Sequence, residues 1–196
     1  MTYINWGKPF EYEVGDETFS FPTYGNYGGA GYSAGTFGQN PPVDQSSSYL
    51  SDGELADNKD ALDYRFYKHD VASDLANTPA EQKAADLKLI RGIDNLSDAQ
   101  LSDPEASFYA GLATIGIGGQ ALASNPSSAF ANKLLPYLDD ALDNIEDGLS
   151  GISQAERAKA VAVLEDTVDA LQDINFPGSA VDRIVDALGI QVDVFL

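Results

Sequence analysis

Six glycines fall within residues 24–38 of this 196-residue chain, and this density is what most restricts its fold. Glycine adopts backbone angles that other residues avoid, so the segment is expected to be an irregular loop with accessible carbonyl groups. Just before it, residues 10–14 and 17–21 alternate apolar and polar side chains around Gly15-Asp16. This pattern predicts a β-hairpin that leads into the loop.

Helix-start signals follow one another through the rest of the chain, beyond a turn-forming stretch over residues 39–58. Residues 78–81, Thr-Pro-Ala-Glu, are typical: they combine a capping box with proline at the first helical position. The expected helix starts are Asp57 or Asn58 (for a helix that ends near Leu75), Thr78, Asp103, Asn125 and Ser153, with a short last helix over residues 179–188. Apolar residues recur at helical spacing over residues 134–149 and 161–171, which indicates core stripes. The chain is therefore predicted to be mainly α.

Composition excludes several classes of site and partner. The chain has no cysteine, so disulfides, thiolate zinc sites and cysteine nucleophiles are excluded. Eleven Lys and Arg against 31 Asp and Glu give a net charge of −20, which would be repelled by a nucleic-acid backbone. The most apolar run, residues 110–123, is shorter than the ~20 residues that span a bilayer, so no transmembrane segment is expected.

Both ends of the chain bear on its localisation. The N-terminus has no basic start followed by an apolar stretch, so no N-terminal signal peptide is expected. The last five residues, VDVFL, place an acidic residue before a short apolar tail, which resembles the C-terminal signal of bacterial type I secreted proteins. The acidic, cysteine-free composition fits an acidic cytosol, a halophile or export by a route that reads the C-terminus. Of these we expect a secreted protein, with a terminal strand or docked tail as the alternative for this segment.

The single histidine, His69, is the first candidate for chemistry. Two antiparallel helices joined by a tight turn over residues 76–79 would place position 86 opposite position 69, and position 86 is Asp86. A carboxylate there can accept from one ring nitrogen and leave the other to take a proton from water. His69 and Asp86 therefore form the predicted pair of catalytic base and orienting group.

Asp70 follows the histidine directly and points to a metal. A carboxylate near a glycine-rich loop with free carbonyls gives an all-oxygen site, which suits a hard cation, calcium above all. Bound calcium could polarise a carbonyl group as a Lewis acid. From the residues alone, we predict a calcium-assisted hydrolase that uses histidine-activated water.

The same residues resemble a known family. The segment YGNYGGAG, residues 24–31, is similar to the calcium loop of the phospholipase A2 superfamily, and DYRFYKHD, residues 63–70, is similar to its active-site helix. The lack of cysteine matches the disulfide-free branches, such as the parvoviral capsid domain. The resemblance implies a phospholipase A2-like core over residues 1–123, with an N-terminal β-hairpin, a calcium loop and an antiparallel catalytic helix pair. Residues 124–196 would be a helical extension packed on this core.

The resemblance also implies residue roles. His69 would be the base, Asp86 the distal aspartate, and the substrate the sn-2 ester of a glycerophospholipid at a membrane or micelle surface. The implied calcium ligands are the backbone carbonyls of Tyr27, Gly29 and Gly31 and the carboxylate of Asp70. This chain has Ser73 where the family usually has a tyrosine that supports the distal carboxylate, and residues 45–59 make a long connection.

Two other interpretations remain open. Gly31-Tyr32-Ser33-Ala34-Gly35 fits the G-x-S-x-G nucleophile elbow of serine esterases, although no apolar strand precedes it and no helix pattern follows. The chain could also be a non-catalytic, calcium-stabilised binding or adhesion module. At −20 it would be repelled by anionic bilayers, so an enzyme is expected to act on zwitterionic or dispersed lipid, or to be carried to membranes by calcium or a partner. Lys68, Asp60 and Asp74 are interpreted as solvated charges.

Overall fold

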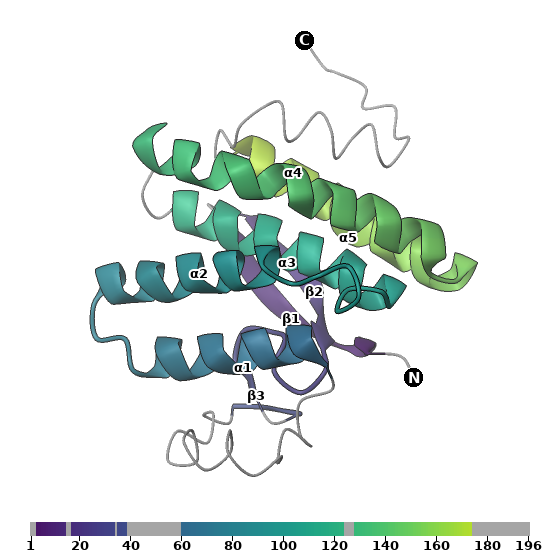
Figure 1. Cartoon of the computed structure of the whole chain (residues 1–196), viewed down its shortest axis with the longest axis horizontal. Helices are drawn as coiled ribbons and strands as arrows, with labels where there is room; N and C mark the ends of the chain where they lie inside the picture. Colours follow the sequence, from purple (N-terminus) through teal and green to yellow (C-terminus); the bar gives the residue numbers. More distant parts are fainter. Residues whose placement is uncertain (1–2, 15–16, 34, 39–59, 124–127, 174–196) are drawn as a thin grey trace.

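The structure is a computed structural model that describes residues 3–14, 17–33, 35–38, 60–123 and 128–173. Within these ranges, two antiparallel strand pairs are followed by five helices, which confirms the mainly α prediction with its N-terminal hairpin (Figure 1). The elements are β1 (Ile4–Val14), β2 (Glu17–Tyr24), β3 (Tyr32–Ser33), β4 (Thr36–Phe37), α1 (Ala61–Asp74), α2 (Pro79–Asp94), α3 (Pro104–Ala123), α4 (Ser128–Gly151) and α5 (Gln154–Asp173). The turn at 15–16, the stretch 39–58, the helix start at 125–126, the last helix at 179–188 and the C-terminal tail lie outside the described residues.

The hairpin is longer than its alternating pattern predicts. β1 and β2 pair from Val14 opposite Glu17 to Ile4 opposite Tyr24, with an irregular register between Asn5 and Phe10. Glycine and proline in that stretch break the sequence pattern, and the irregularity accommodates them in the strand. The hairpin therefore ends at Tyr24, which is also the first residue of the glycine-rich loop.

Helix α1 begins later than predicted. Its N-cap is Asp60, whose carboxylate accepts the backbone N–H of Asp63 at 2.8 Å, so the predicted caps at Asp57 or Asn58 were wrong. The Tyr24 hydroxyl donates a short hydrogen bond to the other oxygen of the same carboxylate. Asp60 is therefore a helix cap tied to the hairpin, and its interpretation as a solvated charge was wrong as well.

The predicted starts of α2 and α5 are confirmed at their capping boxes. In α2, Thr78 Oγ1 accepts the N–H of Glu81 at 3.2 Å, and the Glu81 carboxylate accepts the N–H of Asn77 at 2.8 Å. In α5, Ser153 Oγ accepts the N–H of Glu156 at 3.3 Å, and the Glu156 carboxylate accepts the N–H of Ser153 at 3.0 Å. These local bonds satisfy N–H groups that a helix start leaves without partners, which is why the sequence marks them well.

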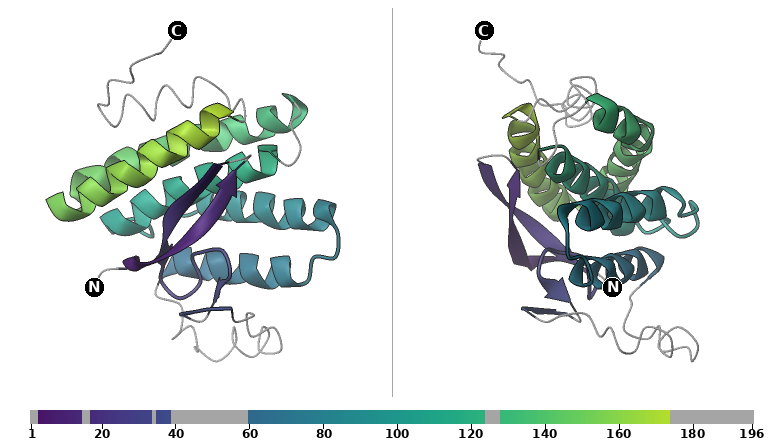
Figure 2. Two further views of the ribbon diagram at one scale, coloured as in Figure 1. Left: turned by 180° about the vertical axis from the view of Figure 1, so that it is seen from behind. Right: turned by 90° about the vertical axis from the view of Figure 1, so that its left-hand side faces the viewer.

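Helices α1, α2, α3 and α4 are stacked in chain order, and the hairpin lies across them together with α5 (Figures 1 and 2). Helix α3 is at the centre and is buried along most of its length. Its closest neighbour is α4: a Cβ added at Gly111 would lie 2.2 Å from the Ala141 carbonyl oxygen. One hydrophobic core runs from Ile4 in the hairpin to Leu171 in α5, so α4 and α5 pack on the same core as the site-bearing helices.

None of the helices in the described residues is both long and apolar enough to cross a membrane.

Candidate functional site

One buried carboxylate attaches the glycine-rich loop to α1. Asp63 accepts the backbone N–H of Asn26 at 3.0 Å and that of Tyr27 at 2.9 Å. Gly25 has a φ of 55°, and a Cβ at that position would lie 2.4 Å from the Asp63 carboxyl group. The close approach therefore requires glycine, and it fixes the loop beside the helix that carries His69.

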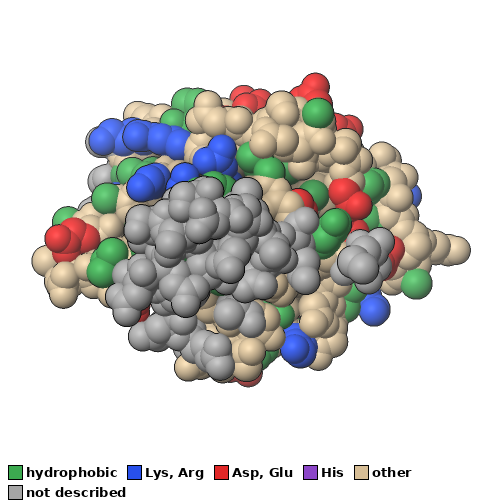
Figure 3. Space-filling model, turned by 60° about the horizontal axis from the view of Figure 1, so that its bottom comes forward, with side chains coloured by type: hydrophobic (Ala, Val, Ile, Leu, Met, Phe, Trp, Pro, Cys, Tyr) green, Lys and Arg blue, Asp and Glu red, His purple; other side chains and the backbone are tan. Residues whose placement is uncertain are grey.

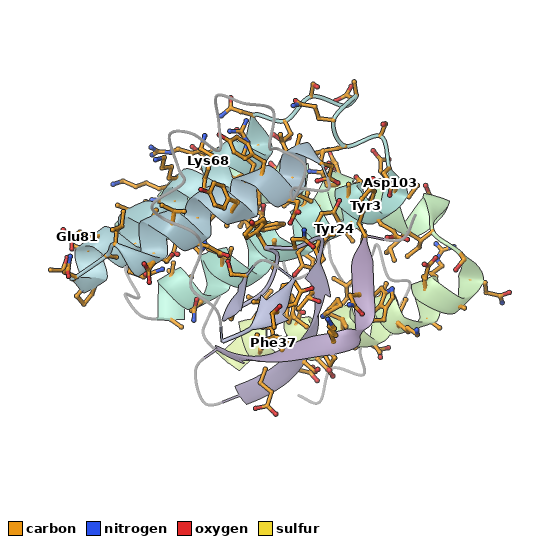
Figure 4. The ribbon with its side chains drawn as sticks, turned by 90° about the horizontal axis from the view of Figure 1, so that it is seen from below. Tyr3, Tyr24, Phe37, Lys68, Glu81 and Asp103 are labelled. Atoms are coloured by element: carbon orange, nitrogen blue, oxygen red, sulfur yellow. The ribbon has the colours of Figure 1, made fainter. Side chains whose placement is uncertain are left out.

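Tyr24 is the second attachment between the hairpin, the loop and the helices. Its ring stacks on Tyr109 of α3 at 4.9 Å between centroids and meets Phe66 of α1 edge-on at 6.2 Å. Burial, followed by the negative charge of Asp60, raises the pKa of its hydroxyl far above the usual value. Figure 4 shows it beside Tyr3, whose ring centroid is 5.9 Å away. An aromatic cluster thus holds the start of the loop, in addition to the bonds from Asp63.

The structure places His69 and Asp86 opposite each other on α1 and α2, as the antiparallel arrangement predicts. His69 Nε2 and Asp86 Oδ1 are 2.8 Å apart, and both side chains are largely buried. An ionised carboxylate can only accept, so the pair assigns the ring hydrogen to Nε2. Nδ1, which makes no hydrogen bond to the described residues, is then the basic nitrogen.

A residue missed by the sequence interpretation, Gln82, supports this pair. Its side-chain amide donates to Asp86 Oδ1 at 3.1 Å and to Ser73 Oγ at 3.0 Å. Ser73 Oγ in turn lies 3.4 Å from His69 Nε2. Gln82 is one helical turn before Asp86, and this i, i+4 spacing is the signal that could have identified it. The Asp86 carboxylate therefore has a supporting partner, although the chain has Ser73 where the resemblance led us to expect a tyrosine.

Asp70 lies half-buried beside the loop, and its Oδ2 atom is fully buried. Its Oδ2 has no hydrogen-bond partner in the described structure, an unfavourable arrangement for a carboxylate without a ligand. The pKa of Asp70 is raised to about 8, chiefly by burial; the nearby Ser33 hydroxyl opposes this shift, and the negative charge of Asp63 adds to it. Ser33 Oγ is itself buried and makes no hydrogen bond of normal geometry. Asp70 is thus poised to gain from a cation.

A cavity of about 260 Å³ brings the predicted site residues together. All six line its wall: Tyr27, Gly29, Gly31, His69, Asp70 and Asp86. The rest of the lining is mostly apolar and includes Phe10, Phe21, Phe66, Leu89, Tyr109, Ala113, Gly116 and Ile117. The arrangement thus sets one imidazole base and two carboxylates, those of Asp70 and Asp86, against a pocket that can hold a hydrocarbon group.

The loop carbonyls are partly engaged. The Gly29 carbonyl accepts the N–H of Tyr32 at 3.1 Å, and the Gly31 carbonyl accepts the N–H of Gly38 at 2.9 Å. Each carbonyl oxygen has a second lone pair that a cation could use. Among the described residues, no three His, Asp or Glu side chains gather as a metal site. Calcium at this loop would therefore combine the Asp70 carboxylate with backbone oxygens, which hard cations accept.

The serine-elbow alternative lacks its structural setting. Ser33 is 3% exposed and pairs with Thr36 in the short β3–β4 strand pair. A nucleophile elbow requires an exposed serine between a strand and a helix. Within the described residues, Ser33 belongs to a small antiparallel ribbon and its hydroxyl faces Asp70.

No known protein family, no curated protein and no solved structure matches the chain.

Proposed function

We propose that the protein is a calcium-dependent hydrolase of the phospholipase A2 type, which cleaves the sn-2 acyl ester of glycerophospholipids with a histidine-activated water. The observation that carries the proposal is the cavity whose wall contains the His69–Asp86 pair, the orphaned Asp70 oxygen and the glycine-rich loop.

His69 acts as the general base in this proposal. Its Nδ1 removes a proton from a water molecule that attacks the ester carbonyl. Asp86, held by Gln82, keeps the ring in the tautomer with hydrogen on Nε2 and stabilises the imidazolium that forms. The proton then passes from His69 to the departing alcohol, which returns the ring to its neutral form.

The Asp70 region fits a calcium ion. An unpartnered, buried carboxylate oxygen beside loop carbonyls matches the ligands that calcium prefers. Asp70 and the carbonyls of Tyr27, Gly29 and Gly31 would hold the ion. Bound calcium supplies positive charge that stabilises the oxyanion of the attacked ester.

The apolar lining supports a lipid substrate. Aromatic side chains from the hairpin and α1 and small residues from α3 surround the space next to His69. Burial of a hydrocarbon chain contributes about 0.8 kcal/mol for each CH₂ group, so such a wall favours an acyl ester over a polar one.

The test is fatty-acid release from sn-2-labelled phosphatidylcholine in calcium at about 5 mM, compared with EGTA. We expect calcium-dependent release that is lost in His69→Ala and kept in Asp74→Asn, a matched change at an exposed position on the same helix. Release that ignores EGTA, or that survives His69→Ala, contradicts the proposal.

A second candidate is a calcium-stabilised binding module without turnover. The observation that favours it is that the Gly29 and Gly31 carbonyls already accept backbone hydrogen bonds, so the loop is structured without a cation. Calcium that raises the melting temperature with no fatty-acid release would support this candidate.

A further inference from the structure

A second, smaller hollow lies on the outer side of the helix pair that carries His69. It measures about 50 Å³ and is lined by residues of α1 and α2 alone: Arg65, Lys68, His69, Ala72, Ala85, Lys88, Leu89 and Gly92. We call it the basic hollow, because three of these side chains are cations and none is a carboxylate. Its volume is several times the 10–15 Å³ that one water molecule needs, which is enough for a phosphate-sized group.

Within the described residues, no carboxylate neutralises the charges in the basic hollow. Arg65, Lys68 and Lys88 form no ion pair with another described residue, and the buried Arg65 Nε has no hydrogen-bond partner there. Lys68 lies over the Tyr64 ring at 4.9 Å, and Lys88 is exposed. Arg65 packs along Gly92, where an added Cβ would lie 3.3 Å from its Cδ. The cations therefore face one another around an open space that an anion would complete.

This placement contrasts with the charge of the whole chain. Of the 11 Lys and Arg, five lie on α1 and α2: Arg65, Lys68, Lys83, Lys88 and Arg91. With its bottom turned forward, the molecule shows a group of Lys and Arg side chains on its surface (Figure 3), and Figure 4 labels Lys68 in the view from below. Asp63 and Asp86 of the same helices are buried and bonded on the inner side, toward the loop and the cavity. The exposed carboxylates of these helices, Asp74, Glu81 and Asp94, lie at the helix ends, so the helix pair is locally positive in its middle, where the basic hollow lies.

We infer that the basic hollow binds the phosphate of an anionic phospholipid and docks the protein on anionic lipid surfaces. The inference rests on the proposed function, for which it names the lipid class. It also revises the expectation of a zwitterionic surface drawn from net charge alone. His69 lines both the basic hollow and the cavity, so a lipid phosphate held there lies next to the proposed base.

The experiment measures binding without turnover, so that it stands apart from any test of hydrolysis. The full chain in EGTA is sedimented with vesicles of phosphatidylcholine alone or with about one third phosphatidylglycerol, at about 0.1 M salt. We expect binding to the anionic vesicles only. Lys68→Gln/Lys88→Gln should weaken this binding by roughly 25-fold, because each cation at such a surface contributes about fivefold.

The matched control is Lys133→Gln/Arg157→Gln, which removes the same charge from exposed positions on α4 and α5. It should change binding by less than about threefold. Lys88→Gln alone, at an exposed position, serves as the second variant and should lose about fivefold. Equal losses in the control, or equal binding of both vesicle types, would overturn the inference. Stabilisation by inorganic phosphate with no vesicle binding would also overturn it, in favour of a soluble phosphate ligand.

Discussion

The carboxylate of Asp63 accepts the backbone N–H of Tyr27 at 2.9 Å, joining two parts of the chain that are 36 residues apart in sequence. This bond places the loop and the His69 helix in one rigid arrangement before any ligand arrives. The proposed calcium site and the proposed catalytic base can share one wall of the cavity only if that arrangement holds.

The substitution Gly25→Ala tests how much the close approach of the loop to Asp63 stabilises the protein. The new methyl group would meet the Asp63 carboxyl at 2.4 Å at a residue whose φ is 55°, so we expect a loss of about 3 kcal/mol in the free energy of unfolding. Urea denaturation measures the loss. Gly38→Ala is the control, because its φ is 75° but its Cβ would meet nothing, and only the backbone strain of about 1 kcal/mol should appear.

Asp86→Asn should keep the fold and lower kcat by roughly 10³-fold or more, because the amide cannot stabilise the imidazolium as the carboxylate does.

Gln82→Ala should lower kcat about tenfold through one lost hydrogen bond to a charged group, with little change in KM. Steady-state kinetics on dispersed lipid separate the two constants. A Gln82 variant that changes KM alone would argue against a positioning role.

Asp70 makes the stability of the calcium-free protein depend on pH. Its folded-state pKa is about 8, above the ordinary value of 3.8, so the folded state holds the proton more tightly than the unfolded state does. Stability should therefore fall as pH rises from about 4 to about 8 and level off above that range. Asp70→Asn should remove this slope and raise the melting temperature at pH 8 by roughly 4–8 °C, as a gain of about 2 kcal/mol would.

We also expect calcium to stabilise the wild type and to stabilise Asp70→Asn much less, since the amide is a weaker ligand for a hard cation. Thermal melts in calcium and in EGTA measure both effects. Wild-type and Asp70→Asn proteins that respond equally to calcium would place the ion elsewhere.

Gly111→Ala should destabilise the packing of α3 on α4 by about 3 kcal/mol, because its Cβ would lie 2.2 Å from the Ala141 carbonyl oxygen. Gly118→Ala in the same helix is the matched control. Its Cβ would be 3.6 Å from Leu134, an ordinary contact, so helix propensity should make it neutral or stabilising by up to about 1 kcal/mol. Chemical denaturation of the two variants gives the comparison.

Local signals in the sequence predicted local structure well. The boxes at Thr78 and Ser153 identified their helix starts because the bonds that cap a helix lie within four residues. The His69–Asp86 pair could be predicted because a tight turn between two helices fixes which positions face each other. Both inferences needed only the chain's own geometry over short distances.

Contacts between distant segments were beyond such reasoning. Asp60 caps α1, although Asp57 and Asn58 are equally suitable cap residues. The second carboxylate oxygen of Asp60 accepts a hydrogen bond from Tyr24, which is 36 residues away in sequence. The role of Asp63 depends on how closely the loop approaches α1, which no spacing reveals. The basic hollow could not be predicted for the same reason, because Arg65 and Lys88 come together only when α1 and α2 pack.

The His69–Asp86 pair contains the only imidazole in the chain. Its ring protons therefore give a single pair of resonances in a proton magnetic-resonance spectrum, without overlap from any other histidine. The arrival of calcium, substrate analogue or lipid beside the site can be followed on that one spin system, in the unlabelled wild-type protein.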